Sequence, residues 1–139
     1  MDLLREEGAL AVSLVAELDG EVVGHIAFSP VTLDRQPEDA AAAGLGPMAV
    51  LPEVQRQGIG LRLIRAGLEA CQDAGVEMVV VLGHPGYYPK AGFVSSAQFG
   101  ITCKWKVPEE VFMVQALKVG ALTQFGGVVQ YHPAFDKVT

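Results

Sequence analysis

The clearest chemistry in this sequence belongs to a glycine-containing loop, residues 50–60, between an apolar run and a long helical pattern. Its sequence is Val50-Leu51-Pro52-Glu53-Val54-Gln55-Arg56-Gln57-Gly58-Ile59-Gly60. Gly58 and Gly60 lack Cβ atoms, so a ligand can approach their backbone closely. The first amides of a helix have no intrahelical acceptors and carry a partial positive charge, which suits phosphate. The loop therefore predicts a phosphate site, with a purely structural glycine turn as the alternative.

Two other phosphate-binding patterns do not fit this loop. A dinucleotide-binding fingerprint requires a third glycine at position 63, where the sequence has Leu63. A Walker A loop requires Gly-Lys followed by Ser or Thr, and the sequence lacks that combination. The loop therefore belongs to neither of these nucleotide-binding classes.

The loop leads into a predicted helix from Gly58 to Ala74, with Gly75 as its C-terminal stop. The apolar residues at helical spacing are Leu61, Ile64, Leu68 and Cys71. The other faces carry Arg62, Arg65, Glu69 and Gln72. This distribution predicts a helix that packs one face against a sheet.

Strands are expected on both sides of this helix. Residues 45–50 predict a buried strand, in which Pro47 removes a ladder donor and so indicates a bulge or an unpaired backbone position. Residues 77–83 are almost continuously apolar, as in a strand covered on both faces. Strand, helix and strand form a right-handed parallel unit, whose ligand site lies at the carboxyl end of the first strand.

Further strands are predicted at Ala9–Leu18, Glu21–Pro30, Val111–Leu117 and Val128–Tyr131. Asp19-Gly20 joins the first two and predicts a type I′ hairpin turn. Residues 34–44 show neither strand alternation nor a helical face, so we expect an exposed loop on the substrate side. The pattern is mixed α+β, and 139 residues predict one domain, residues 1–139.

Composition excludes several classes of function. Ten Lys+Arg against sixteen Asp+Glu give a formal charge of −6, opposite to the charge that a nucleic-acid-binding protein needs. The longest apolar stretch, Ala40–Pro52, is interrupted by glycine and proline and is shorter than the ~20 residues of a membrane span. The acidic start does not resemble a signal peptide, which predicts a cytoplasmic protein. Cys71 and Cys103 are too few for a disulfide framework or a metal site.

Several segments together resemble the GNAT superfamily of N-acetyltransferases. Residues 55–60 match the family's Q/R-x-x-G-x-G/A signature, and residues 48–53 resemble its L-A-V-x-P-E strand end. Residues 87–93 resemble its later F-Y-x-x-x-G-F segment. The tail, residues 107–135, resembles the YhbS-like branch of small bacterial members. The resemblance extends from about Leu14 to the C-terminus.

The resemblance implies a GNAT-like α+β fold: a mixed, mostly antiparallel sheet whose central parallel strand pair is splayed to admit acetyl-CoA. The family normally begins with a further strand and one or two helices. Here the first strand is expected near Ala9, and Met1–Gly8 supply only the end of a helix, so the fold is N-terminally shortened. Either the start is truncated or a partner chain completes the sheet edge, which makes a homodimer a candidate.

The resemblance also implies that acetyl-CoA is the co-substrate. Its pyrophosphate is expected on the backbone amides of Arg56, Gln57, Gly58, Ile59 and Gly60. Met48 and Val50 are expected to pair with the pantetheine arm like an extra strand. The amide near Met48 or Ala49 would polarise the thioester carbonyl. The side chains of Arg56 and Arg62 either add charge to the phosphate site or are simply solvated.

Tyr88 matches the position of the family's general acid, and a tyrosine hydroxyl is protonated at neutral pH because its ordinary pKa is about 10. The alternative is that Tyr87 and Tyr88 are amphipathic packing residues. The roles assigned to other residues are less direct than this one.

The general base is not fixed by the sequence. Many family members place glutamates where this chain has Gly46 and Pro47. His25, Glu17, a water relay or the deprotonated fraction of the amine itself would serve instead. His25 is also explained as a half-buried strand histidine, and His84, near the splayed edges, as part of an ordinary turn.

The leading hypothesis is an N-acetyltransferase that joins acetyl-CoA and a primary amine in a ternary complex, with no metal. The alternative is a non-catalytic acyl-CoA-binding or regulatory protein, and the third is a structural domain with a fortuitous glycine loop. The acceptor is a small-molecule or peptide amine: protein N-termini, lysines, polyamines, amino acids, aminoglycosides and small metabolites all remain open. The negative net charge favours a cationic acceptor. No nucleic-acid or membrane partner is expected.

Overall fold

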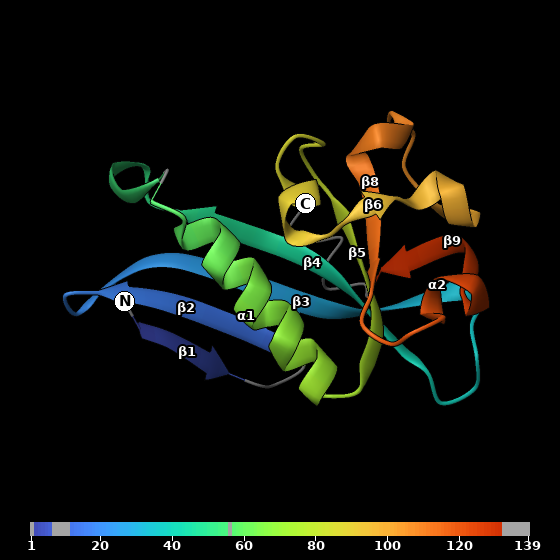
Figure 1. Cartoon of the computed structure of the whole chain (residues 1–139), viewed down its shortest axis with the longest axis horizontal. Coiled ribbons are helices and arrows are strands. Elements are labelled where there is room, and N and C mark those ends of the chain that lie inside the picture. Colours follow the sequence, from blue (N-terminus) through green and yellow to red (C-terminus); the bar gives the residue numbers. More distant parts are fainter. Residues whose placement is uncertain (1, 7–11, 56, 132–139) are drawn as a thin grey trace.

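The computed structural model describes residues 2–6, 12–55 and 57–131, which form one sheet covered by a long helix (Figure 1). The strands are β1 (Asp2–Glu6), β2 (Val12–Leu18), β3 (Glu21–Arg35), β4 (Ala41–Val50), β5 (Val76–Leu82), β6 (Val94–Ser95), β7 (Ile101–Cys103), β8 (Phe112–Ala116) and β9 (Gly126–Tyr131). The α-helices are α1 (Ile59–Asp73) and the short α2 (Ala121–Gln124), and single 3-10 turns span Pro52–Val54, Tyr88–Ala91, Ser96–Phe99 and Glu109–Val111.

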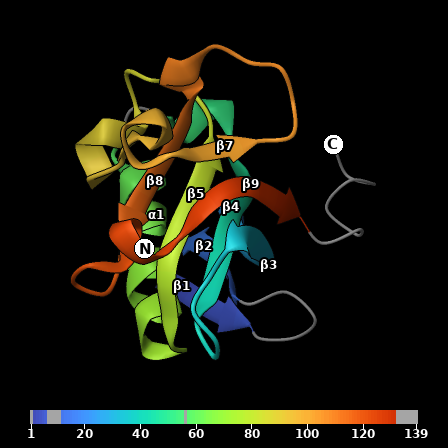
Figure 2. The same cartoon turned by 90° about the vertical axis from the view of Figure 1, so that its right-hand side faces the viewer.

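The sheet order is β1-β2-β3-β4-β5-β8-β6, and β9 pairs with both β3 and β7. β4 and β5 are parallel, as predicted, and most other pairs are antiparallel. A second parallel pair, β7 with β9, was not predicted; the two strands run side by side in Figure 2. The predicted α+β fold, a mostly antiparallel sheet with a central parallel pair, is confirmed.

The hairpin between β2 and β3 has the predicted turn. Asp19 and Gly20 both have positive φ, 53° and 83°, as a type I′ turn requires at its two central positions. The strand predicted from Ala9 is observed from Val12, and residues 9–11 lie outside the described residues.

The start of the chain differs from the prediction. A first strand near Ala9 and the end of a helix over Met1–Gly8 were expected, but Asp2–Glu6 is a strand, β1. It pairs antiparallel with β2, from Asp2↔Glu17 to Glu6↔Ser13. The physical reason is that β2 would otherwise expose a row of unpaired backbone groups, which this segment satisfies.

The loop predicted over residues 34–44 was wrong for most of its length. β3 continues to Arg35 and β4 begins at Ala41, so the connection is short. Alanine and glycine disfavour strands when exposed, but here tertiary packing selects them. At Gly44 an added Cβ would lie 2.7 Å from Cε1 of Tyr131, so the strand needs a residue without a side chain there.

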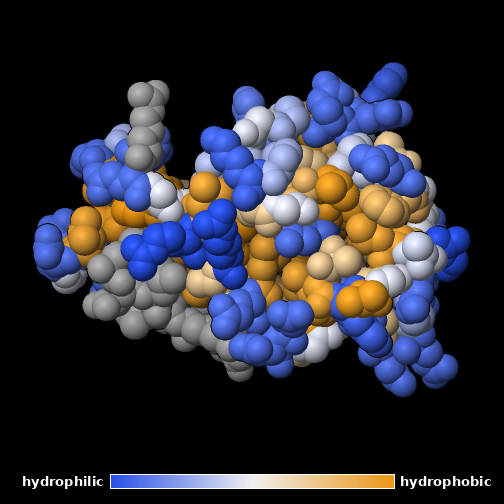
Figure 3. All heavy atoms as spheres, in the orientation of Figure 1, coloured by the Kyte–Doolittle hydropathy of each residue, from blue (hydrophilic) through white to orange (hydrophobic). Residues whose placement is uncertain are grey.

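The predicted helix is confirmed as α1, which lies across β2, β3 and β4 in Figure 1. The four side chains expected on its other faces, Arg62, Arg65, Glu69 and Gln72, are all exposed. Hydrophilic side chains accordingly cover this face in Figure 3. Beneath the helix, the Phe28 ring packs where a Cβ at Gly67 would come within 2.7 Å of Cζ. Gly67 therefore permits close contact between helix and sheet.

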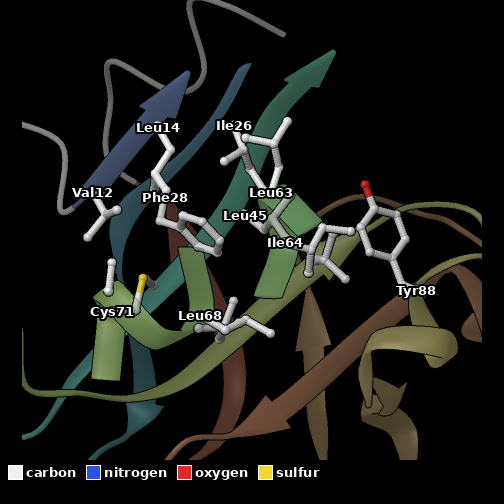
Figure 4. Close-up of a cluster of buried hydrophobic side chains, with 14 of the residues drawn as sticks. Val12, Leu14, Ile26, Phe28, Leu45, Leu63, Ile64, Leu68, Cys71 and Tyr88 are labelled. Atoms are coloured by element: carbon white, nitrogen blue, oxygen red, sulfur yellow. The ribbon is translucent and has the colours of Figure 1, made fainter. Parts of the chain in front are cut away.

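Two apolar cores lie on opposite faces of β5. The first core, between α1 and the sheet, includes Val79 and Val81 and is shown in part in Figure 4. The second core contains Met78 and Val80, with Phe125 packed against them. β5 is therefore covered on both faces, as its sequence predicted. Within the described residues, no helix is both long enough and apolar enough to cross a membrane.

Candidate active site

A β-bulge interrupts β4 at the proline that the sequence singled out. The register between β3 and β4 is Ile26↔Met48 on one side and Phe28↔Leu45 on the other. Two residues of β4, Gly46 and Pro47, therefore lie opposite one residue of β3. Such a bulge redirects a strand and leaves backbone groups unpaired. The predicted irregularity at Pro47 is confirmed.

The same position marks where β4 and β5 separate. Their parallel pairing runs from Ala41↔Val76 to Leu45↔Val81. β4 continues to Val50 and remains paired with β3 through Met48, Ala49 and Val50. Among the described residues, no strand pairs with the other edge of this segment. Apart from the Val50 carbonyl, which accepts a hydrogen bond from Gln55, backbone groups on that edge are therefore available to a ligand.

A cavity of 870 Å³ opens beside this free edge. Its lining residues are Met48, Ala49, Val50, Val54, Gln55, Gly58, Ile59, Gly60, Leu61, Tyr87 and Lys90. Six of the eight residues expected to hold the co-substrate are thus brought together. Gln57 is exposed and outside this lining, and Arg56 lies outside the described residues. The cavity joins the end of β4 to the start of α1, as the strand-helix-strand argument required.

The start of α1 is open toward the cavity. Gly58 occupies the N-cap with φ 79°, in the left-handed region, and no side chain caps the helix. The first helical backbone bond closes from the Arg62 amide to the Gly58 carbonyl at 3.1 Å. The earlier amides have no intrahelical acceptor, so the helix start offers free donors together with the positive end of the helix dipole.

The loop before α1 is held in place by the side chain of one of its own residues, Gln55. Gln55 Nε2 donates a hydrogen bond of 2.9 Å to the Val50 carbonyl oxygen and so ties the loop back to the end of β4. Gly60 faces Tyr87, and an added Cβ would overlap the Tyr87 hydroxyl. Gly60, the second glycine of the motif, therefore has a structural role: without a side chain at this position, Tyr87 can reach the start of α1.

Sequence reasoning missed several lining residues, most notably Lys90. Among the described residues that line this cavity, Lys90 is the one with a charged side chain. It lies in the Tyr87–Phe93 segment, which the sequence had flagged without giving the lysine a role. Arg62, in contrast, is exposed and does not line the cavity.

A second cavity, of 560 Å³, lies on the other side of Met48. Its lining residues are Leu45, Gly46, Pro47, Met48, Leu82, Tyr88, Trp105, Val107 and Tyr131. Tyr87 lines the first cavity and Tyr88 the second, and their rings contact edge to face with centroids 5.3 Å apart. Met48 and this tyrosine pair therefore form the boundary between the two cavities.

Tyr88 is held in place by packing on several sides. Its ring lies at the margin of the first core (Figure 4). The Phe93 ring packs edge to face against it, with the centroids 5.9 Å apart. The absence of a side chain at Gly83 makes room for it, since a Cβ there would lie 2.8 Å from Cδ2 of Tyr88. Burial, with a smaller contribution from Tyr87, raises the pKa of Tyr88 above its ordinary value. Its hydroxyl is therefore protonated at neutral pH.

Neither candidate base, His25 or Glu17, lines either cavity, and neither does His84. His25 is half-buried on β3, opposite Ala49, and lines neither. His84 accepts a 2.9 Å hydrogen bond at Nδ1 from the Gly86 amide, as in an ordinary turn. Glu17 pairs with Val22 near the hairpin. No carboxylate or imidazole lines either cavity within the part of the chain that the structure describes. Nor do three metal-ligating side chains gather anywhere in that part.

Comparison with known proteins gives the family. The model of the acetyltransferase (GNAT) family matches residues 2–93. The uncharacterized N-acetyltransferase YhbS of Escherichia coli K12 is 39% identical over 135 residues, covering 96% of this chain and 80% of that protein. YjhQ of the same strain, another N-acetyltransferase, is 39% identical over 131 residues, covering 91% and 72%.

Solved structures agree with this assignment. The structure of Escherichia coli YhbS in complex with CoA superposes with a TM-score of 0.85 at 37% identity, covering 91% of this chain and 70% of that one. A GNAT acetyltransferase from Brucella melitensis in complex with acetyl-CoA gives a TM-score of 0.71 at 42% identity, covering 92% and 70%. Family model, relatives and fold agree: this chain belongs to the acetyltransferase (GNAT) family, in its YhbS-like branch, and is an acyltransferase.

Proposed function

We propose that this chain transfers an acetyl group from acetyl-CoA to a primary amine by direct attack in a ternary complex. The observation that carries the proposal is one cavity lined both by the unpaired edge of β4, Met48–Val50, and by the glycine-rich start of α1. The similar structures from Escherichia coli and Brucella melitensis contain CoA and acetyl-CoA. We treat residues 1–139 as the single domain that performs this reaction.

In this proposal the pyrophosphate lies on the backbone amides at the start of α1, from Gln57 to Gly60. The Arg56 amide completes this set on the basis of the sequence alone. The open N-cap at Gly58 supports the placement, because free amides and the helix dipole both favour an anion. Lys90 adds a positive charge to the lining of the same cavity. The pantetheine arm pairs with Met48 and Val50 along the edge that β5 leaves free.

The reaction is nucleophilic substitution at the thioester carbon. The neutral amine forms the C–N bond, the C–S bond breaks, and the coenzyme leaves as a thiolate while the attacking nitrogen loses a proton to water. The amide of Met48 or Ala49 polarises the carbonyl oxygen, and loss of one such donor costs ~3 kcal/mol in other enzymes. Tyr88 donates its proton to the thiolate. Its position at the boundary of the two cavities and its raised pKa support this role.

The attacking amine is deprotonated by water, or enters the site already neutral. This follows from the lining of both cavities, which contains no carboxylate or imidazole among the described residues. The same observation favours a second candidate function, a protein that binds acyl-CoA without catalysis, and the experiment must separate the two.

The test combines ligand binding with turnover. Acetyl-CoA at about 100 times its Kd should stabilise the wild-type protein by ~2.7 kcal/mol, measured by thermal or chemical unfolding. Tyr88→Phe should keep this stabilisation and lose roughly 10²- to 10⁴-fold in kcat, as expected for removal of a general acid. Tyr87→Phe, the adjacent matched control, should change kcat far less.

Each outcome assigns one function. Stabilisation by acetyl-CoA without transfer to any amine would identify a non-catalytic binder. No stabilisation by acetyl-CoA would refute both functions. Equal loss of kcat in Tyr87→Phe and Tyr88→Phe would remove Tyr88 from the reaction.

A further inference from the structure

The second cavity adjoins the place where the proposed reaction occurs. It shares Met48 with the first cavity, and Tyr88 in its wall contacts Tyr87 in the wall of the first. A molecule in the second cavity can therefore present an amine at Met48, where the thioester carbonyl is placed under the proposed function. The chemistry of this cavity then selects the acceptor.

The wall of the second cavity is aromatic and aliphatic. Tyr88, Trp105 and Tyr131 contribute rings, and the Trp105 and Tyr131 centroids are 5.0 Å apart with a tilt of 41°. Tyr131 is only 8% exposed and packs over Gly44, where a Cβ would lie 2.7 Å from its ring. Tyr88 is 9% exposed. Tyr131 is held on β9, Tyr88 lies in the Tyr88–Ala91 turn, and together with Trp105 they offer an aromatic surface to an apolar ligand.

No charged side chain lines this cavity among the described residues. Burial, with a smaller effect of Cys103, raises the pKa of Tyr131, so its hydroxyl stays neutral and supplies no negative charge. A positive charge lies beside the aromatic wall, since Lys104 Nζ is 5.1 Å from the Trp105 ring centroid. A second cation at that ring would meet repulsion from Lys104.

A ligand carrying a second ammonium would therefore lose water without gaining a carboxylate partner, which is unfavourable. The reacting end carries a primary amine in every acceptor and so does not distinguish acceptors. The group at the other end of the acceptor does distinguish one acceptor from another. The net charge of −6 attracts cations at long range, but none of that negative charge lines this cavity in the described chain.

We propose that the acceptor is a primary amine on an uncharged, apolar carbon skeleton, which occupies the cavity walled by Tyr88, Trp105 and Tyr131. This inference rests on the proposed function for the direction in which the amine points. It excludes polyamines and aminoglycosides as preferred acceptors, since these carry additional ammonium groups.

The first test compares hexylamine with 1,5-diaminopentane. The two have the same number of heavy atoms and the same reacting amine, and they differ by a terminal methyl in place of an ammonium. Trp105 is the single tryptophan of the chain and lines the cavity, so its fluorescence reports occupancy. Titrations use full-length protein saturated with CoA, which permits binding without turnover, and calorimetry provides an independent Kd.

We expect hexylamine to bind saturably, with a Kd at least tenfold lower than that of 1,5-diaminopentane. Equal affinities, a preference for the diamine, or no saturable hexylamine binding by either method would overturn the inference. Because binding is measured with CoA and no acetyl group, this result does not depend on whether Tyr88 catalyses transfer. Selective hexylamine binding without acetylation would count against the proposed transfer alone, because the preference of the cavity for an apolar amine is measured by binding.

The second test reverses the preference. Val107 lies half-buried in the wall, so Val107→Glu places a carboxylate in the cavity without burying it fully. Val107→Gln is the matched neutral control. We expect Val107→Glu to shift the ratio of the two Kd values at least tenfold toward 1,5-diaminopentane, with Val107→Gln close to wild type. A shift of equal size in both variants, with unfolding temperatures unchanged, would show that the charge of this wall does not select the acceptor.

Discussion

The two halves of β4 have the same neighbour on one side and different surroundings on the other. From Ala41 to Leu45 the strand pairs with β5, from Ala42 it also pairs with β3, and it is largely buried. After the bulge at Gly46 and Pro47, the segment Met48–Val50 keeps β3 but no longer pairs with β5. One continuous strand thus anchors the core with its first half and offers backbone groups to a ligand with its second.

This contrast shows that the site is defined by what the backbone leaves unpaired more than by reactive side chains. The open half of β4, Met48–Val50, supplies amides and carbonyls, and α1 supplies further amides. The closed half, Ala41–Leu45, fixes where those groups lie. Changes in the closed half should therefore alter stability, and changes around the open half should alter ligand binding and rate.

Among the tests of this contrast, the largest expected effect is the dependence of rate on pH. With no base in the described lining, kcat/KM should follow the neutral fraction of the acceptor, which rises tenfold per pH unit below an amine pKa of about 10.4. From pH 7 to pH 9 we expect an increase of roughly 100-fold with an alkylamine. Tyr88 must be protonated to act as the acid, and burial raises its pKa, so no decline should occur below about pH 10.

Initial rates at subsaturating hexylamine check this profile. A plateau reached below pH 8 would show that an enzyme group takes the proton. His25→Asn is the appropriate comparison, because His25 lies near Ala49 in the register but outside both cavities. Its profile should coincide with that of the wild type.

The closed half of β4 is tested by Gly44→Val. An added Cβ would lie 2.7 Å from the Tyr131 ring and 3.2 Å from Val31 Cγ1, so both neighbours must shift. Overpacking of this kind lowers the free energy of unfolding by ~1–3 kcal/mol. Ala41→Val, at an exposed position of the same strand, should change it by less than ~0.5 kcal/mol. Urea unfolding measures both, and equal effects would contradict the tight packing of Tyr131 and Val31 against Gly44.

Beside the open half, Gly60→Ala should weaken acetyl-CoA binding by about tenfold, or ~1.4 kcal/mol. The reason is steric: the new methyl group overlaps the Tyr87 hydroxyl in the wall of the first cavity. The double variant Gly60→Ala/Tyr87→Phe removes that oxygen, and the nearest remaining atom, Tyr87 Cζ, is 3.4 Å away. Calorimetry should show recovery of affinity in the double variant. If affinity does not recover, contact with the tyrosine is not the cause.

The sequence predicted the parts of this molecule whose local rules are strong. The type I′ turn at Asp19-Gly20, the amphipathic helix after Gly58 and the irregularity at Pro47 each depend on neighbouring residues, and the structure confirms them. The family resemblance placed six of eight expected residues in one cavity. Their roles in binding remain proposals.

The parts that were missed depend on tertiary contacts. The strand over Ala41–Gly44 is made of weak strand formers and exists because Tyr131, distant in the sequence, packs against it. β1 was not predicted because this segment becomes a strand through its pairing with β2, and not through its own sequence pattern. Trp105 and Tyr131 meet across the second cavity only through the pairing of β9 with β3 and β7. No local pattern indicates such a meeting.

The smallest expected effect concerns Lys90. Its ammonium lines the first cavity but is exposed to solvent, so its attraction to a phosphate is screened. Lys90→Gln should raise the Kd for acetyl-CoA about two- to fivefold at low salt, with the difference shrinking as ionic strength rises. Lys90→Arg should keep most of the affinity, and Arg62→Gln, outside the lining, should have a smaller effect still. A salt-independent loss in Lys90→Gln would mean that the lysine acts by packing and not by charge. A larger loss in Arg62→Gln would place the phosphates over the outward face of α1 and away from the open half of β4.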